Sequence, residues 1–154
     1  MKKLLFILLS VLWANAYSQN DFIMKSNTYP IIEIKVDGNL FCVLIDTGSG
    51  INILDERIVK AKDVVTAEST INSFAGYFKL NGLYTKKCDY NGRLISKFLV
   101  GDIKHALKQI SIKTKFDVVG ILGTPAIKEL GMVIDLSRGI VTINKNSDTT
   151  VSTD

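Results

Sequence analysis

The chain has 154 residues, a formal net charge of +4, and 47% hydrophobic and 22% charged residues. This length fits one domain, and the balance of apolar and charged residues excludes a disordered or collagen-like chain. Two cysteines exclude a disulfide-dense scaffold, no apolar run reaches the roughly 20 residues of a membrane span, and the basic residues are not clustered as in nucleic-acid-binding proteins.

Residues 1–16 have the order of a secretory signal peptide. Two lysines precede an apolar run over residues 4–12, and Ala14-Asn15-Ala16 supplies the small residues that a signal peptidase accepts. The alternative is a buried N-terminal helix or strand. We expect export to the periplasm or the cell exterior, with cleavage after Ala16 or Ser18, which the sequence leaves open.

The first half of the mature chain is expected to be rich in β-strands. Residues 31–36 and 39–45 carry many β-branched side chains and flank Asp37-Gly38. This dipeptide predicts a tight hairpin, because a type I′ turn needs positive φ at both positions. Residues 54–61, with apolar side chains four apart and acids in the first turn, are expected to form a short helix.

Glycine-containing dipeptides punctuate the middle of the chain at Ala75-Gly76, Asn81-Gly82 and Asn91-Gly92. They predict two successive hairpins, the second pairing residues 83–88 with residues 93–100. The segment that follows, residues 101–105, is expected to be a solvated loop.

The last third of the chain begins with an apolar strand over residues 117–123, which two glycines interrupt. Pro125 near a first turn and Gly131 at the end predict a short helix over residues 125–130. Residues 132–135 and 139–143 are expected to form a final hairpin.

The mature chain is therefore expected to hold one domain over residues 28–145. An N-terminal segment over residues 17–27 precedes it, and a polar, disordered tail over residues 146–154 follows it. Cys42 and Cys88 both lie in strand-like stretches, so the sequence leaves open whether they pair in an oxidising compartment or remain buried thiols.

The segment most informative about chemistry is Ile45-Asp46-Thr47-Gly48-Ser49-Gly50, at the end of an apolar strand. Its structural alternative is an Asp-initiated turn before the next element. A dinucleotide-binding loop would need glycine at Ile53, and a calcium loop would need glycine at Ile51 and glutamate at Arg57. A nucleophile elbow would need a glycine frame that Ser49 lacks. These three kinds of site are excluded.

Two short motifs stand in a definite order along the chain. Asp46-Thr47-Gly48 follows one apolar strand, and Ile121-Leu122-Gly123 ends another about 75 residues later. In this order and spacing the chain resembles the retropepsin-like aspartic peptidases, the single-domain relatives of pepsin that include retroviral proteases. The resemblance covers residues 28–145, because the expected helix and strand over residues 124–135 also match the family's terminal elements.

The resemblance implies a mostly β fold, a closed antiparallel acid-protease barrel with one short C-terminal helix and a flap hairpin. It implies an aspartic endopeptidase that hydrolyses peptide or protein substrates with no metal and no cofactor. In that family Asp46 is the catalytic carboxylate, and Ile121, Leu122 and Gly123 pack across its loop.

Peptide hydrolysis by water needs one group to take the water's proton and another to protonate the carbonyl oxygen and the leaving amine. Two carboxylates about 3 Å apart that share one proton can do both. The chain has one Asp-Thr-Gly, and Asp135 lacks the glycine that should follow a catalytic aspartate. We therefore expect the second carboxylate to be Asp46 of another copy, across the two-fold axis of a homodimer.

The neighbours of Asp46 have roles that the resemblance implies. Thr47 would hydrogen-bond across the dimer axis and hold the two loops together. Gly48 would permit a close backbone approach that a Cβ atom would block. Ser49 would donate a hydrogen bond to the outer oxygen of Asp46 and favour its ionised form.

The family also closes a flap hairpin over the substrate, which shields the reaction from bulk water. We expect this hairpin within residues 71–84, with its tip at Ala75-Gly76 or at Asn81-Gly82. Phe74 and Tyr77 fit ordinary half-buried hairpin aromatics as well as they fit substrate contacts. The expected flap contacts are Phe74, Ala75, Gly76 and Tyr77.

Other candidate sites have less support. His105 is the only histidine and no local motif recruits it to a nucleophilic site, while one histidine and two separated cysteines do not form a metal-ligand set. The lysines at 86–87 and within 104–115 fit a solvated surface.

A non-catalytic module for peptide binding or assembly, on the same fold, is the alternative function. The intact Asp46-Thr47-Gly48 favours the enzyme, whereas the polar tail after Ile143 lacks the apolar terminal strand that retroviral dimers interleave. The sequence leaves the substrate, the cleavage specificity and the pH optimum open.

Overall fold

The structure is a computed structural model, and it describes residues 21–73 and 76–144. The expected signal peptide over residues 1–16 and the expected tail over residues 146–154 lie outside the described residues. The elements follow in the order β1 (Asp21–Ile23), β2 (Ile31–Val36), β3 (Asn39–Ile45), β4 (Asn52–Asp55), η1 (Glu56–Ile58), η2 (Ala61–Asp63), β5 (Val64–Ser73), β6 (Gly76–Tyr84), β7 (Cys88–Tyr90), β8 (Arg93–Ile95), β9 (Phe98–Gly101), α2 (Lys104–Thr114), β10 (Val118–Leu122), α3 (Thr124–Glu129), β11 (Met132–Asp135) and β12 (Ile140–Ile143).

The strands form two sheets, so the prediction of a mostly β fold is confirmed. The larger has the order β5-β6-β9-β4-β10-β3-β2-β7-β8, and the smaller has the order β1-β12-β11. Within the described part of the chain the larger sheet ends at β5 and β8, and no ladder joins these two strands. The closed barrel is therefore not confirmed. Strand β1, from the expected N-terminal segment, pairs with β12 and belongs to the fold.

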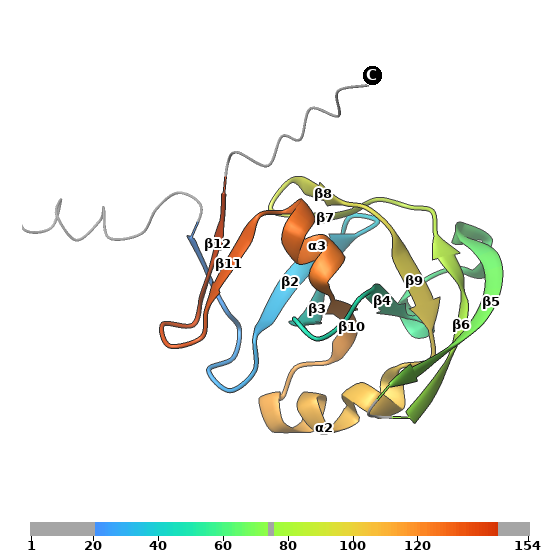
Figure 1. Cartoon of the computed structure of the whole chain (residues 1–154), viewed down its shortest axis with the longest axis horizontal. Helices are drawn as coiled ribbons and strands as arrows, with labels where there is room; N and C mark the ends of the chain where they lie inside the picture. Colours follow the sequence, from blue (N-terminus) through green and yellow to red (C-terminus); the bar gives the residue numbers. More distant parts are fainter. Residues whose placement is uncertain (1–20, 74–75, 145–154) are drawn as a thin grey trace, which may run out of the picture.

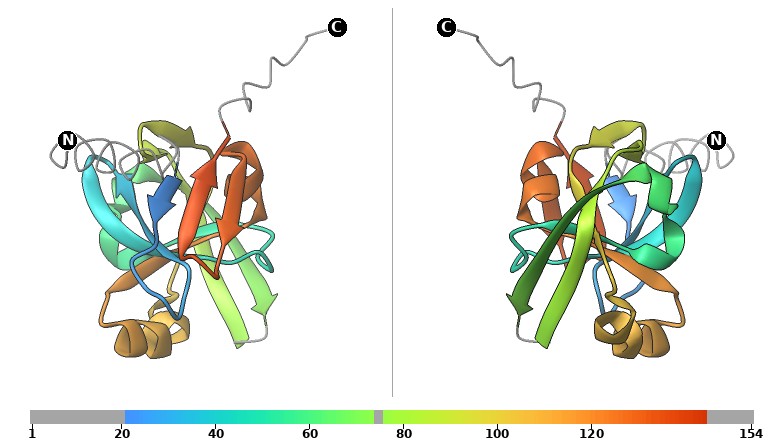
Figure 2. Two further views of the ribbon diagram at one scale, coloured as in Figure 1. Left: turned by 90° about the vertical axis from the view of Figure 1, so that its left-hand side faces the viewer. Right: turned by 90° about the vertical axis from the view of Figure 1, so that its right-hand side faces the viewer.

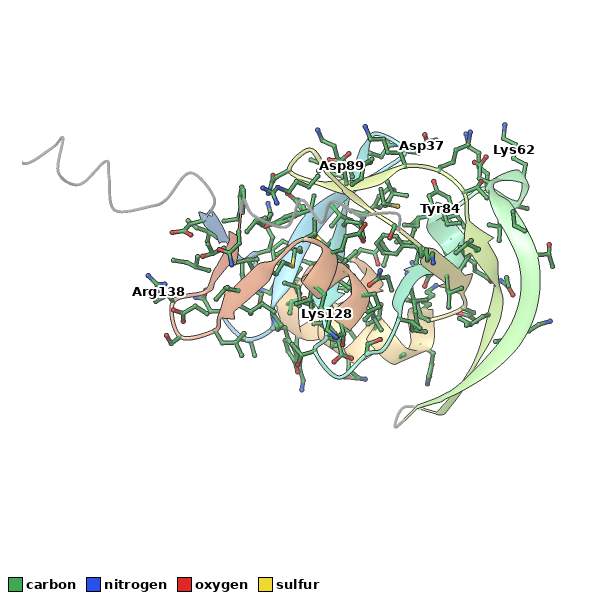
Figure 3. The ribbon with its side chains drawn as sticks, turned by 45° about the horizontal axis from the view of Figure 1, so that its top comes forward. Asp37, Lys62, Tyr84, Asp89, Lys128 and Arg138 are labelled. Atoms are coloured by element: carbon green, nitrogen blue, oxygen red, sulfur yellow. The ribbon has the colours of Figure 1, made fainter. Side chains whose placement is uncertain are left out.

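The two sheets give the molecule two distinct ends. The three-stranded sheet lies at one end and the long β5–β6 hairpin at the other (Figure 1). Arg138, at the tip of the β11–β12 hairpin, marks the end far from β5 and β6 (Figure 3). No helix in residues 21–73 and 76–144 has both the length and the apolar character to cross a membrane.

Two predicted tight turns are confirmed by their backbone angles. Asp37 and Gly38 have φ of 49° and 84°, and Asn91 and Gly92 have φ of 50° and 82°, as type I′ turns require. The first turn joins β2 to β3, with Val36 opposite Asn39. The second joins β7 to β8, with Cys88 opposite Ile95. The predicted pairing of residues 83–88 with residues 93–100 is divided between two ladders, because residues 98–101 pair with β4 and β6, where Leu83 lies opposite Leu99.

The hairpin of β5 and β6 closes between Ser73 and Gly76, the last residues that pair across it. This is one of the two predicted tips. The other, Asn81-Gly82, is wrong, because it lies inside β6 where the register shifts. Gly82 has φ of +153°, and a Cβ atom there would collide with the carbonyl group of Val65 on the neighbouring strand.

The predicted helix over residues 54–61 is wrong. Residues 52–55 are strand β4, and only the short 3-10 turns η1 and η2 follow. All four residues of β4 are buried, because the strand lies between β9 and β10. Pairing on both edges outweighs the local helical spacing of Leu54 and Ile58.

The predicted loop over residues 101–105 is also wrong, because helix α2 begins at Lys104 and ends at Thr114. The described chain therefore has two α-helices instead of one short C-terminal helix. Ile103 and Leu107 are buried against the larger sheet. The C-terminal helix itself is confirmed as α3, with Pro125 in its first turn.

Cys42 and Cys88 are both free thiols. Cys42 in β3 and Cys88 in β7 lie on strands that flank β2 on opposite sides, paired with Glu33 and Val36. Two strand spacings amount to about 10 Å, which exceeds the Cα separation of a disulfide. The fold therefore holds the two cysteines apart.

Candidate active site

The two sequence motifs meet where β3 and β10 end. These strands are parallel neighbours, with Ile45 opposite Leu122, so their carboxyl ends lie at the same edge. Residues 46–51, here called the Asp46 loop, lead from β3 to β4, and β10 lies between those two strands. The Asp46 N–H donates to the carbonyl oxygen of Leu122 at 2.9 Å. The loop thus crosses the end of β10.

The start of α3 holds the middle of the Asp46 loop. The Thr124 N–H donates to the Ser49 carbonyl at 2.8 Å, and the Thr124 hydroxyl lies 2.9 Å from the same oxygen and 3.4 Å from the Thr47 carbonyl. Figure 3 shows α3, which carries Lys128, beside the segment that joins β3 to β4. The loop is therefore docked on the helix through its carbonyl groups.

Gly123 is the position where this contact is tightest. A Cβ atom there would lie 2.7 Å from the Ser49 carbonyl oxygen and would collide with that of Ile51. The preceding residues fit the predicted packing role, since Leu122 is fully buried and Ile121 pairs with Leu44 and Ile53 on either side. The structure thus brings Ile121, Leu122 and Gly123 under the loop.

Asp46 itself is half-buried, and one of its oxygens is fixed by the loop. Oδ1 accepts the Gly48 N–H at 2.9 Å, and the Ser49 N–H lies 3.1 Å from the Asp46 carbonyl. A Cβ atom on Gly48 would lie 3.2 Å from Oδ1, so glycine gives the carboxylate its close approach. Among the described residues no hydrogen bond reaches Oδ2. Thr47 and Gly48 are exposed beside it.

Ser49 does not take its predicted partner. Its hydroxyl donates to the carbonyl oxygen of Ile51 at 2.8 Å. A hydroxyl has one proton to donate, so the expected hydrogen bond from Ser49 to Asp46 is not made here. Ser49 instead shapes the second half of the loop.

Two of the four predicted flap residues belong to the part of the chain that the structure describes. Phe74 and Ala75 lie outside the described residues, while Gly76 and Tyr77 begin β6. The Asp46 loop and the β5–β6 hairpin project from the same side of the molecule (Figure 2).

Sequence reasoning missed two residues of this site, Thr124 and Asn52. Asn52 is almost fully buried at the start of β4, and its Oδ1 accepts the Gly123 N–H at 3.0 Å. An amide between Ile51 and Ile53 in an apolar run is a sign of burial, and a buried amide needs partners. The partners themselves come from 44 to 74 residues away.

Asp135 and His105 lie outside the site. The Asp135 carboxylate accepts hydrogen bonds from the hydroxyl of Ser137 and from Arg138 in the β11–β12 turn, and these hold the pKa of Asp135 well below its ordinary value. His105 is exposed in the first turn of α2. Within residues 21–73 and 76–144, no three His, Cys, Asp or Glu side chains come together as a metal site.

The arrangement offers one half-exposed carboxylate on a loop that hydrogen bonds hold to β10 and α3, at the carboxyl ends of two parallel strands. Such a group can accept a proton or activate water, but a single carboxylate cannot also supply the proton for the leaving group. Comparison of the chain with protein-family models and with curated proteins gave no match.

Proposed function

We propose that the protein is an aspartic endopeptidase of the retropepsin type, with an active site completed by Asp46 from two copies of the chain. The observation that carries the proposal is the Asp46 loop, in which a half-exposed carboxylate lies across Leu122 and Gly123 at the ends of β3 and β10. An ordinary Asp turn would account for the Gly48 hydrogen bond but not for the second motif beneath it.

In this mechanism the two Asp46 carboxyls share one proton, because two like charges about 3 Å apart do not both ionise. The ionised carboxylate takes a proton from water as the water oxygen attacks the peptide carbonyl carbon. The other carboxyl gives its proton to the carbonyl oxygen. The tetrahedral intermediate then breaks its C–N bond, and the proton taken from water passes to the leaving amine. One hydroxyl of the intermediate returns its proton to the other Asp46 carboxylate as the new carboxyl product forms, which restores the shared proton.

The second carboxylate comes from a second chain in this proposal. Asp135, the other aspartate considered, is held in its own turn by Ser137 and Arg138. Strand β12 has β1 on one edge and β11 on the other, so it offers no free edge for the interleaving seen in retroviral dimers. The two subunits therefore meet through the exposed part of the Asp46 loop, at Thr47 and Gly48.

The fold assignment belongs to the same proposal. The larger sheet, with β10 inserted between β3 and β4, corresponds to the acid-protease barrel, and the β5–β6 hairpin is its flap. The substrate is a peptide or protein that lies between this hairpin and the Asp46 pair. The enzyme uses no metal or cofactor and acts after export, once residues 1–16 have been removed.

Cleavage of casein or of a peptide library between about pH 4 and 7 tests this function. We expect the wild-type protein to cleave and Asp46→Asn to be inactive, because asparagine keeps the shape and cannot exchange the proton. Asp135→Asn is the control and should remain active. Equal cleavage by wild type and Asp46→Asn would overturn the mechanism. Peptide binding without cleavage by either protein would favour the non-catalytic module.

A further inference from the structure

We infer that Asn52 is a positioning residue: it holds the Asp46 loop against the end of β10, so that the Asp46 carboxylate lies where the reaction needs it. This inference rests on the proposed function. Asn52 is the first residue of β4, directly after the loop, and its side chain is 1% exposed. All of its polar contacts are with backbone groups. They reach two separate parts of the chain.

The acceptor side of the carboxamide faces the end of β10. Oδ1 accepts the Gly123 N–H at 3.0 Å and the Ala126 N–H at 3.4 Å. The first N–H groups of a helix have no partner within the helix, and Gly123 at the cap position of α3 has no side chain to serve them. Asn52 supplies that cap from another strand.

The donor side of the carboxamide faces the turn between β8 and β9. Nδ2 lies 3.3 Å from the Lys97 carbonyl and 3.4 Å from the Ser96 carbonyl. The same turn is held independently by Glu129, whose carboxylate accepts the Ser96 N–H at 3.0 Å. The β8–β9 turn is therefore held by Glu129 as well as by Asn52. Among the described side chains, only Asn52 holds the Gly123 N–H.

One peptide group holds both ends of the Asp46 loop. The carbonyl of Leu122 accepts the Asp46 N–H at 2.9 Å, and the N–H of Gly123, in the same peptide bond, donates to Asn52 at 3.0 Å. Loss of the Asn52 acceptor would remove the side-chain contact between the second end of the loop and β10, leaving the backbone ladder of β4 and the Thr124 contacts, and would bury the Gly123 N–H without a partner.

The position of the loop matters more for the chemical step than for substrate binding. Two carboxyls that share a proton must be held within about 0.5 Å of their productive geometry. Binding along the substrate depends instead on many contacts with the flap and the cleft. A misplaced loop therefore lowers kcat more than it changes KM.

Three variants separate the possible roles of Asn52. Asn52→Leu has a similar volume and loses both halves of the amide. Asn52→Asp keeps an acceptor toward Gly123 and loses the donor toward the turn. Glu129→Ala weakens the same β8–β9 turn and leaves the Gly123 contact intact, so it is the matched control for general destabilisation.

We expect kcat for peptide cleavage to fall about 100-fold in Asn52→Leu, with KM within about threefold of wild type. Asn52→Asp should recover at least about tenfold of that loss. Glu129→Ala should lower the melting temperature and leave kcat within about twofold of wild type. If Asn52→Leu keeps its kcat, or if kcat follows the melting temperature across all three variants, the inference is wrong.

Amide hydrogen exchange at Asp46 and Thr124 gives a second readout that needs no activity. We expect both amides to exchange faster in Asn52→Asp than in wild type, with a smaller increase in rate than in Asn52→Leu. Glu129→Ala should leave the exchange rates of both amides unchanged. Unchanged exchange in both Asn52 variants contradicts the inference even if Asn52→Leu folds poorly. Absence of cleavage by the wild-type protein contradicts the proposed function instead, so the two failures are distinguishable.

Discussion

Gly123 shows how closely single residues determine the candidate site. Its α-carbon faces the carbonyl oxygens of Ser49 and Ile51, so any side chain would push the Asp46 loop away. We expect Gly123→Ala to lower the free energy of unfolding by at least about 1–3 kcal/mol, the usual cost of overpacking. Urea denaturation measures this change.

Gly50→Ala is the matched control in the same loop. A Cβ atom on Gly50 would meet no atom within 4 Å, so its effect on the free energy of unfolding should stay within about 0.5 kcal/mol. A Gly123→Ala protein as stable as Gly50→Ala would mean that the loop does not pack against the second motif as described.

The core of the site could be predicted from the sequence because it depends on two contiguous motifs. Asp46 and Leu122 each end an apolar strand, and their meeting requires only that those strands be neighbours. The partner of the Ser49 hydroxyl could not be predicted, because it is the Ile51 carbonyl and its direction depends on how the loop turns. Asn52 was missed because its partners are backbone groups from distant segments.

At the scale of elements, local sequence patterns predicted the tight turns correctly. They failed for segments whose secondary structure depends on burial and pairing with distant strands. Asp37-Gly38 and Asn91-Gly92 form the predicted turns because positive φ is a local requirement. The predicted helix over residues 54–61 took in the last two residues of strand β4, because the pairing of β4 with β9 and β10 cannot be read from residues 54–61 themselves. Helix α2 was missed although Ile103, Leu107 and Ile110 have the i, i+4, i+7 spacing of an amphipathic helix, because the lysines between them were interpreted only as a solvated surface.

The end of α2 offers a test of its boundary. Lys115 caps the helix in the left-handed conformation with φ of 62°, which costs a residue with a Cβ atom roughly 1–2 kcal/mol relative to glycine. We expect Lys115→Gly to raise the free energy of unfolding by about 0.5–1 kcal/mol after the entropic cost of glycine is included. Thermal unfolding followed by circular dichroism measures the shift.

Lys113→Gly is the control, two residues earlier and inside the helix. Glycine there should lower the free energy of unfolding by about 1 kcal/mol. Two changes of the same sign would place the helix end elsewhere than Thr114.

At the scale of the whole molecule, the two sheets are joined by apolar contacts that include a titratable group. Tyr90 in β7 packs edge-on against Phe22 in β1, with ring centroids 5.3 Å apart. Burial raises the pKa of the Tyr90 phenol to about 12, and burial does the same for Tyr84. The folded protein therefore keeps these protons at a pH where the unfolded chain loses them.

This difference predicts alkaline destabilisation. Below a pH of about 10 both states are protonated, and between about 10 and 12 only the folded state holds the proton, so stability falls as the pH rises through that window. Urea denaturation across this range should show a shallower fall for Tyr90→Phe than for wild type. An identical pH dependence in the two proteins would mean that Tyr90 is accessible to water in the folded state.

The overall topology depends on pairings between distant segments. The mostly β class and the final β11–β12 hairpin could be predicted, because alternation and turn residues are local. The insertion of β10 between β3 and β4 joins segments about 75 residues apart and was not predicted. The resemblance to a known family implied only that residues 121–123 pack across the Asp46 loop. The same resemblance suggested a closed barrel, which the strand order does not confirm.

The central claim is that each chain supplies half of a catalytic pair, and a mixing experiment tests it most directly. Wild-type and Asp46→Asn chains are refolded together in equal amounts at constant total concentration, and the rate of peptide cleavage is compared with that of wild type alone. If activity needs Asp46 from both subunits, only dimers of two wild-type chains are active, and the rate falls to about one quarter. A rate of about one half would mean that each chain acts on its own, and would contradict the account.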